Sequence, residues 1–556
     1  MTKAITKAQF VLNLQTRVRL PWRWFRVSYA LTLLVLLCIA SIPAFSSTPA
    51  QEPASTSAIN DLLNVLLANG TITQQQYDTL KQHYAVQREA QTAPQPEQPV
   101  PVVKPAQVVT SMENVVGFHA GPYDVTFSGE INGFYVHNRP DNTPILDSSP
   151  STIPNTSCLL CLASANALPS SSLRNGLLPG DLNIKVSSKQ DGFDVAVVFG
   201  IWPGIESLMT SPAGLNLAAG EPTGFGVQGV DFRQQYLTFG KPRMGTFKVG
   251  RDLGYLGQEA ILNDMALLGA GTTNISNGAG AGLGPGAVTL GRIGLGYLYT
   301  DFMPQIGWTS PSMSGVQVSG AIFQPLSDIV STTLGATQYS APLTGYGQPQ
   351  YQFKATYATP KIGGAQAKLW TNYLTQSMEA DKSDHNSDAA LTIPVGQSVR
   401  ANAADYGANI AFDGADLLAY GYNGSGVGSE GLLFLATSPS GAKRNSEGYY
   451  LQGTYTILKK GIVGMSYGQS NLSPASAGET PITLGSETST TANGVTTVNI
   501  ANQGMMRNNA SYIGQARYGL TKWVNLVGEF THTRSESQLG ITNSNDSFAL
   551  GSIAFF

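Results

Sequence analysis

The chain has 556 residues, a formal net charge of −3 and only 12% charged residues, against roughly 25% in soluble globular domains. Without a basic excess, nothing in the composition points to nucleic acid as a partner. The mean hydropathy is near zero, which argues against a membrane protein of apolar helices, whereas 61 Gly, 23 Tyr and 21 Phe fit strands that alternate lipid-facing and lumen-facing residues.

The N-terminal residues predict an export signal. Four arginines between residues 17 and 26 precede an apolar run at 27–45, and small residues follow it. This is the order of a secretory signal peptide. We expect residues 1–46 to be that signal peptide, with an uncleaved anchor as the alternative, because the run is close to the length that spans a bilayer.

Residues 58–90 show helical spacing. Apolar residues recur every three or four positions from Ile59 to Leu67, and a capping box follows at Thr73 and Gln76. The string around Gly70 resembles a short helical-hairpin motif appended to many bacterial proteins, which implies self-association. We expect a periplasmic helical hairpin or coiled-coil segment, with a weakly ordered spacer as the alternative. A linker rich in Pro and Gln is expected over 91–120.

From residue 121 to residue 556, apolar residues recur at every second position, as in VTFSGEI (125–131) and YQFKATY (351–357). A period of two is the signature of strands with one apolar face. Sixteen such runs predict strands near 123–137, 181–189, 192–202, 231–240, 244–251, 293–309, 315–324, 350–358, 364–376, 402–413, 415–424, 446–458, 461–469, 508–519, 521–534 and 545–556.

The connections between these runs alternate between short and long. Asp191–Gly192 and Asp413–Gly414 are tight turns, whereas 138–180, 203–230 and 470–507 are long. Transmembrane β-barrels have short turns at one end and long loops at the other. The predicted fold is therefore all-β: a transmembrane antiparallel β-barrel of about 16 strands, preceded by the short α-helical periplasmic segment.

The first long connection contains a C-x-x-C pair, Cys158 and Cys161. A zinc site would need a second pair or nearby His, and a redox motif would need a strand followed by a helix. Neither context is present in the sequence. We expect a local disulfide between the two cysteines, formed in an oxidising compartment.

The C-terminal strand and two internal strings resemble known outer-membrane sequences. The chain ends in SFALGSIAFF, and this end resembles the C-terminal signature of Gram-negative outer-membrane proteins. FRQQYLTFGKPRMGTFKVGRD (232–252) and IGWTSPSMSGVQVSG (306–320) resemble a hairpin and a turn of the general Gram-negative porin family. Trp308 departs from the family's usual Tyr, and Met313 departs from its usual aromatic residue. The resemblance implies a 16-stranded, trimeric channel in the cell outer membrane.

In that family, the loop between the fifth and sixth strands folds into the barrel and narrows the pore. The corresponding segment here is expected at 252–292, with the acids Asp252, Glu259 and Asp264. Strand alternation directs a set of charged residues toward the lumen, because a charge that faces lipid costs about 2–4 kcal/mol. The hypothesis is that the acids oppose basic wall residues across a constriction. The lumen-facing residues are Lys185, Arg233, Lys248, Lys354, Lys368 and Arg517, with Asp124, Glu130, Asp194 and Glu529.

The sequence therefore predicts a passive, water-filled channel for small hydrophilic solutes and ions. It is not expected to be an enzyme or to need a cofactor or metal, because no G-x-S-x-G nucleophile motif or phosphate-binding loop stands in the required context. The alternatives are a substrate-specific channel with a saturable site, for dicarboxylates, sugars or phosphate, and a structural barrel. The expected partners are outer-membrane lipid, two further copies in a homotrimer, and peptidoglycan or periplasmic components at the N-terminal helices.

Overall fold

The computed structural model divides the chain into two units, Met1–Val103 and Lys104–Phe556. The predicted signal peptide, helical hairpin and Cys158–Cys161 pair lie outside the described residues, apart from Asp78 in a helix. The structure describes residues 78, 109–112, 115–140, 169–205, 230–273, 289–326, 343, 345–382, 392–429, 431–476, 488–492, 495–499, 506–538 and 542–556.

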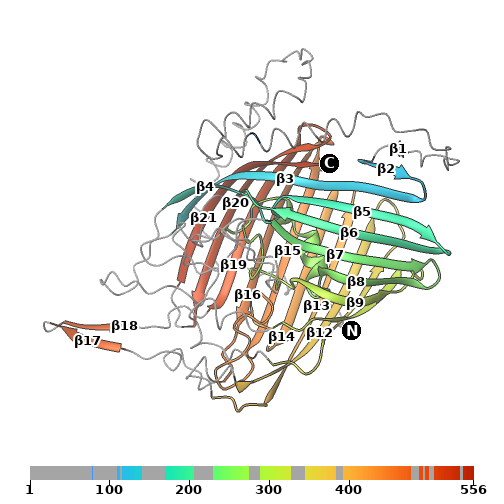
Figure 1. Cartoon of the computed structure of the whole chain (residues 1–556). Coiled ribbons are helices and arrows are strands. Elements are labelled where there is room, and N and C mark those ends of the chain that lie inside the picture. The colour runs from blue at the N-terminus through green and yellow to red at the C-terminus, as the bar shows by residue number, and fades with distance from the viewer. Residues whose placement is uncertain are drawn as a thin grey trace, which may run out of the picture. The chain divides into compact units, whose positions relative to one another are not determined.

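Sixteen antiparallel strands of the described chain form a closed barrel. Each strand pairs with the next along the chain, and the last strand pairs with the first through a register from Asn545–Pro140 to Phe555–Glu130. Figure 1 shows this seam, where β3, near the start of the colour bar, lies beside β21 at its end. Closure leaves the barrel without an unpaired edge. The predicted all-β barrel fold is confirmed.

Fifteen of the predicted runs begin and end within a few residues of the strands in the structure. The prediction at 293–309 is wrong over its first part, because the sixth barrel strand begins only at Phe302. The barrel strands are β3 (Tyr123–Pro140), β5 (Asp181–Gln190), β6 (Phe193–Pro203), β7 (Val230–Lys241), β8 (Gly245–Leu253), β9 (Phe302–Thr309), β10 (Val316–Phe323), β11 (Gln350–Ala358), β12 (Gln366–Glu379), β13 (Ser398–Phe412), β14 (Ala415–Ser425), β15 (Asn445–Ile457), β16 (Gly461–Leu472), β19 (Met506–Gly519), β20 (Val524–Ser537) and β21 (Thr542–Phe555).

Five further strands lie outside the ring of sixteen. The hairpin of β1 (Val109–Ser111) and β2 (Gly117–Ala120) extends the sheet at β3 and falls within the range predicted as linker. Strand β4 (Ser170–Arg174) pairs with residues 134–138 of β3. Strands β17 (Thr488–Ala492) and β18 (Val495–Asn499) pair with each other.

The described helical elements beyond residue 104 are short. Those described over their whole length are α4 (Gln258–Asn263) and the 3-10 helix η2 (Met265–Leu268), both in the connection between β8 and β9. Among the described residues, no helix is long and apolar enough to cross a membrane.

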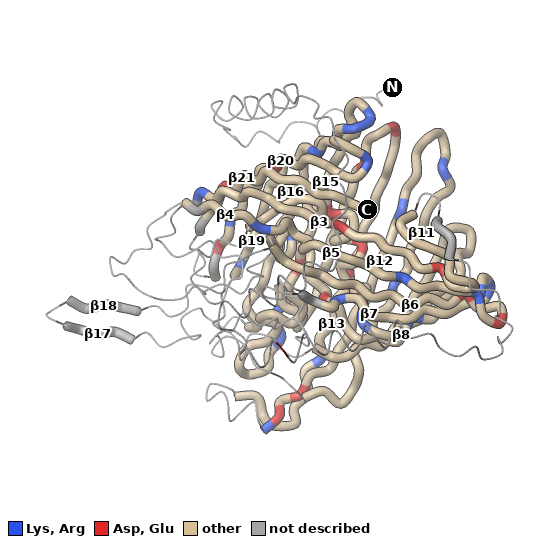
Figure 2. Tube along the Cα trace, turned by 45° about the horizontal axis from the view of Figure 1, so that its top comes forward, with Lys and Arg blue, Asp and Glu red and all other residues tan. Residues whose placement is uncertain are grey.

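Burial alternates along the strands as the period of two requires. On β12, Leu369 and Tyr373 are exposed on the exterior, whereas the alternating residues Trp370, Asn372 and Leu374 are buried in the interior. Large apolar side chains are exposed on the exterior of many strands, including Ile131, Phe353, Ile410, Leu451, Met465 and Leu550. Charged residues are sparse along the strands, and several gather at the ends of hairpins (Figure 2).

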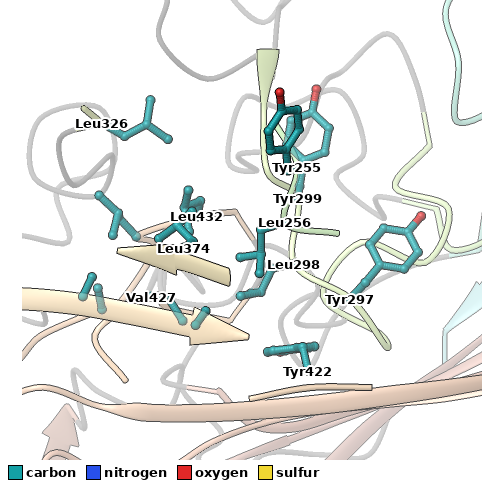
Figure 3. Close-up of a cluster of buried hydrophobic side chains, with 14 of the residues drawn as sticks. Tyr255, Leu256, Tyr297, Leu298, Tyr299, Leu326, Leu374, Tyr422, Val427 and Leu432 are labelled. Carbon is teal, nitrogen blue, oxygen red and sulfur yellow. The ribbon is translucent and has the colours of Figure 1, made fainter. Parts of the chain in front are cut away.

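The largest apolar cluster lies inside the barrel. It joins inward side chains of the wall, such as Leu374 and Tyr422, to residues of the β8–β9 connection and of the β14–β15 connection. Figure 3 shows Leu256 and Leu298 beside Leu432 and Leu374 in this cluster. Apolar surface removed from water contributes about 25 cal/mol per Å². The cluster therefore holds both connections inside the barrel.

Candidate functional site: the barrel lumen and its inner segment

The connection between β8 and β9 folds into the barrel, as the sequence predicted. We call its described residues, 254–273 and 289–301, the inner segment. The segment is almost wholly buried, although it lies between strands and not in one. The sequence predicted that this connection ends at residue 292. It assigned residues 293–301 to the next strand, because apolar residues alternate there as in a strand. Glycines with positive φ at 291, 294 and 296 prevent a strand there.

The first part of the inner segment is bonded to β11 and β13. The backbone N–H groups of Tyr255 and Leu256 both donate to Gln352 Oε1, at 2.7 and 2.9 Å. The N–H of Gly257 donates to Asp405 Oδ2 at 2.5 Å. These N–H groups belong to the turn that precedes α4. Polar wall residues therefore satisfy backbone donors of this turn.

Glu259 of α4 carries the central ion pair of the lumen. Its carboxylate contacts Lys354 Nζ from β11 and lies 2.5 Å from Lys368 Nζ of β12. The Glu259 and Lys354 side chains are 6% and 15% exposed, and that of Lys368 is 40% exposed. Burial would raise the pKa of Glu259, but the two ammonium groups hold it below its ordinary value.

Asp264 is fully enclosed in the inner segment. It accepts a 2.9 Å hydrogen bond from the Tyr297 hydroxyl and a 3.0 Å bond from the Ala266 N–H. Burial raises the pKa of Asp264, and the nearby Arg292 guanidinium opposes this rise. The acid thus joins the two halves of the segment and does not face the lumen.

Arg292 anchors the returning half of the segment. Its guanidinium donates to the hydroxyl groups of Ser466 on β16 and Ser511 on β19, the latter at 3.0 Å. It also lies over the Tyr450 ring of β15, 5.7 Å from the ring centroid. A planar cation with five donors suits such a site.

Further hydrogen bonds join the inner segment to β19, β20 and β3, at or near the seam of the barrel. Gln515 of β19 donates to the Met265 carbonyl at 3.0 Å. Glu529 of β20 accepts from the Gly271 N–H. Thr273 then donates to Asn138 of β3. The inner segment is thus bonded to the wall from β11 around to β3.

The β14–β15 connection also enters the lumen, which the sequence did not predict. The N–H of Leu432 donates to the Tyr299 carbonyl at 3.0 Å, so this connection packs on the inner segment. Leu433 and Leu435 have positive φ and are fully buried. Such backbone is costly for Leu and persists only where packing enforces it.

The interior of β5 to β8 is the wall left open by these contacts. Lys185 of β5 is exposed toward the lumen. Lys248 of β8 forms an ion pair with Asp252 on its own strand. Its Nζ lies 4.6 Å from the centroid of the Tyr236 ring on β7. Gln234 donates to Asp252 at 2.9 Å. This wall is polar, with two lysines and an aromatic ring.

The remaining predicted charges differ in position. Arg233 is buried at an irregularity of the β6–β7 register, with its guanidinium 5.5 Å from the Trp202 ring centroid. Arg517 lies on β19, opposite Val527 and on the same face as Gln515. Glu130 is buried beside Asn132, which donates to it at 3.0 Å.

The structure brings the acids and bases of the lumen into direct contact. Glu259 binds Lys354 and Lys368, and Lys248 binds its neighbour Asp252. Asp264 and Glu529 bind groups of the inner segment itself or its backbone. Among the described residues, Glu259, Asp264 and Glu529 thus hold the inner segment in place. The opposition of acids and bases across a constriction stays a prediction.

Several residues that hold the inner segment had no signal in the sequence. Gln352, Asp405 and Gln452 sit on lumen-facing positions of ordinary strands, and Arg292 follows a Gly-rich stretch. Strand alternation predicts only that the side chains of Gln352, Asp405 and Gln452 face the lumen. No group of three or more His, Cys, Asp or Glu that could hold a metal is found within the described residues.

Neither a protein-family model nor a curated protein sequence matches the chain. Solved structures similar to it include the outer membrane channel DcaP of Acinetobacter baumannii, with 13% identity, a TM-score of 0.49, and 79% of this chain and 99% of that chain covered. The anion-selective porin of Comamonas acidovorans has 12% identity and a TM-score of 0.45, with 78% and 100% covered.

OprB of Pseudomonas putida has 12% identity and a TM-score of 0.45, with 78% and 94% covered. The architecture of the chain is established by its own strand pairing, in which sixteen antiparallel strands close and a connection after the fifth enters the lumen. The chain therefore folds as a closed 16-stranded antiparallel β-barrel.

Proposed function

We propose that the chain is an outer-membrane porin, a water-filled channel for the passive diffusion of small hydrophilic solutes and ions. The observation that carries the proposal is the closed barrel, whose exterior is apolar and whose interior carries polar and charged side chains beside the apolar cluster. Such a barrel presents its apolar band to lipid and its lumen to water. Three copies are expected to assemble, and the N-terminal residues are expected to direct export.

The solute path is proposed to run between the inner segment and the open wall of β5 to β8. The segment is bonded to strands from β11 around to β3, so this wall is what faces it across the lumen. Lys185, Tyr236 and Lys248 lie on the path, and Arg517 lines it nearer the short turns. Lys185 and Lys248 bring positive charge to this wall, although Lys248 is paired with Asp252, and we expect a preference for anions.

Single-channel conductance in a planar bilayer tests the proposal. Refolded protein should give stepwise currents that scale with salt, in groups of three steps if the trimer forms. In a salt gradient, the reversal potential should indicate anion preference. A folded barrel that stays silent in the bilayer would contradict the open channel and favour a structural role.

A substrate-specific channel for small anions is the second candidate. The observation that favours it is the placement of Lys185 and Lys248 within two rows of the same wall, with Tyr236 between them. Each lysine can bind a carboxylate or phosphate group through a charge-assisted hydrogen bond. Flux that saturates with solute concentration would support this candidate, and linear flux would support the general porin.

A further inference from the structure

Two acids stand opposite each other on the inner face of the wall, where β3 pairs with β5. Glu130 of β3 and Asp181 of β5 are direct partners in the register. Side chains at such positions lie on one face of the sheet, with Cβ atoms about 4.5–5.5 Å apart. Ile131, next to Glu130, is exposed on the exterior, so both acids lie on the inner face. Two carboxylates at this spacing repel each other unless a proton or a cation joins them.

The Glu130 carboxylate has one oxygen without a partner. Glu130 is 3% exposed. Its Oε1 accepts a hydrogen bond from Asn132 Nδ2 at 3.0 Å, whereas its Oε2 is buried and accepts none. Neither Glu130 nor Asp181 forms an ion pair with a Lys, Arg or His of the described chain. Burying an unpaired carboxylate is costly, so the bare oxygen indicates a site for a cation.

Asp181 is the more accessible member of the pair. Its side chain is only partly buried, so water of the lumen reaches it. It accepts hydrogen bonds from the Asn183 side-chain amide and from the backbone N–H of Glu130. An ionised carboxylate has about four lone-pair positions. Asp181 therefore keeps the capacity to bind a cation as well.

The connection between β4 and β5 brings a backbone oxygen to the pair. Asn132 Oδ1 accepts from the Gly176 N–H at 2.9 Å, which fixes the orientation of the Asn132 amide. Its Nδ2 therefore donates, and besides Glu130 it reaches the Leu178 carbonyl at 2.9 Å. A carbonyl oxygen has a second lone pair. The Leu178 carbonyl can thus serve as a third oxygen ligand beside the two carboxylates.

The ligand atoms indicate the kind of cation. All three groups offer oxygen, which Ca²⁺ and Mg²⁺ prefer. Ca²⁺ accepts irregular geometry, whereas Mg²⁺ requires a nearly ideal octahedron. No group of three or more His, Cys, Asp or Glu that could hold a metal exists among the described residues, so carbonyl and water oxygens must complete the coordination. With only two charged ligands, we expect a dissociation constant of about 10⁻⁴–10⁻³ M.

We propose that Glu130 and Asp181 bind one Ca²⁺ ion, with the Leu178 carbonyl and lumen water in its remaining positions. The ion neutralises two acids on the wall that also carries Lys185, because Lys185 and Asp181 lie on the same strand. An occupied site therefore makes this wall more positive and strengthens the preference for anions. The binding goes beyond the channel function and does not depend on whether the barrel conducts.

Isothermal titration calorimetry of the full chain tests the site. Calcium chloride is titrated at neutral pH into chelator-treated protein in an uncharged detergent. The unsubstituted protein should bind one Ca²⁺ in the range given above. Glu130→Gln and Asp181→Asn should each weaken binding by about tenfold or more, because each removes a charged ligand and keeps the size of the side chain. Asp181→Asn, at the more exposed position, keeps the test valid if Glu130→Gln does not fold.

Asp194→Asn is the matched control, because it removes an exposed acid of β6 that is paired with Lys189. It should bind Ca²⁺ as the unsubstituted protein does, and magnesium chloride should bind more weakly than calcium chloride. If the folded, unsubstituted protein binds no Ca²⁺, the site is overturned and the two carboxylates share a proton instead. Equal binding by Asp181→Asn and the unsubstituted protein would also overturn the site, because the ion would then lie elsewhere.

The reversal potential in a planar bilayer gives a second readout. Ca²⁺ should shift it toward anions for the unsubstituted protein and leave it nearly unchanged for Asp181→Asn. Shifts of equal size would overturn the effect of the site on the lumen. A silent barrel that still binds one Ca²⁺ would contradict the porin function and leave the cation site standing.

Discussion

At the scale of single residues, Glu259 shows how the lumen is organised. One carboxylate on a six-residue helix receives two lysines from neighbouring strands. A buried ion pair is not in itself strong evidence for stability, but breaking one by removing a single partner leaves an unpaired buried charge. Glu259 therefore matters more for the position of the inner segment than for the net stability that the pair provides.

Glu259→Gln should lower the free energy of unfolding by about 2 kcal/mol, less than the 3–5 typical of fully buried pairs because Lys368 is partly solvated. It should also shift the reversal potential toward anions, since two lysines lose their counter-charge. The matched control is Asp194→Asn, which removes the partner of Lys189 in an exposed pair and should cost less than about 1 kcal/mol. Equal losses for the two variants would contradict the assigned tether.

The pH dependence of this tether follows from its lowered pKa. Because the pKa of Glu259 in the folded chain lies below the ordinary 4.5, its stabilising contribution is fully present above that value. It is lost as the pH falls through the lowered pKa. The difference in unfolding free energy between the unsubstituted protein and Glu259→Gln should stay constant from pH 7 to about pH 5 and shrink below that. A difference that already shrinks near neutral pH would contradict the ion pair.

At the scale of elements, the inner segment depends on backbone that only glycine adopts easily. Gly257 has φ 73°, and a Cβ there would lie 2.7 Å from the Leu298 carbonyl. Its N–H is also the donor to Asp405. The turn before α4 therefore needs both the left-handed conformation and the close approach of the returning chain.

Gly257→Ala should cost more than the 1–2 kcal/mol of a left-handed alanine, since the clash with Leu298 adds to the strain. Gly396→Ala is the matched control: its φ is 81°, but a Cβ would meet nothing within 4 Å. Urea unfolding of both variants from the same vesicles measures the difference. Gly257→Ala should also increase single-channel current noise. Similar losses for both would mean that the close approach does not constrain the segment.

The elements also show what the sequence could and could not predict. Alternation at every second position located the strands, because the barrel wall faces lipid on one side and water on the other. The same alternation failed at 293–301, where Ile293, Leu295 and Tyr297 pack in the lumen instead of forming a strand. Inward parity identified Lys354 and Lys368. It could not tell that they bind Glu259, because that contact depends on how a connection folds back.

At the scale of the whole molecule, the barrel depends on its seam. Strands β21 and β3 are joined across the two ends of the barrel chain, with Phe556 and Gly129 exchanging backbone hydrogen bonds of 3.1 and 3.2 Å. Near the middle of the seam, a Cβ at Gly551 would lie 2.3 Å from the Gly133 carbonyl. The two strands approach closely there because position 551 lacks a side chain.

Gly551→Val should hinder closure, and Gly528→Val on the neighbouring strand should not, since a Cβ at 528 meets only Leu550 at 3.9 Å. The fraction of unheated protein that migrates as a folded barrel in detergent gels measures closure. We expect a clear loss of the folded band for Gly551→Val alone. A full folded band for that variant would show that the seam tolerates a wider spacing.

Because the seam is an ordinary strand pairing, the order of the strands along the chain could be permuted. Because β3 and β21 are bonded through the same antiparallel ladder as every other neighbouring pair, the ring of strands has no structurally privileged starting point. A circular permutant that links Phe556 to Tyr123 through a short spacer and opens at the Asp191–Gly192 turn would keep all sixteen pairings. The first strand to be made would then be β6, and the order of synthesis would change while the finished ring stayed the same.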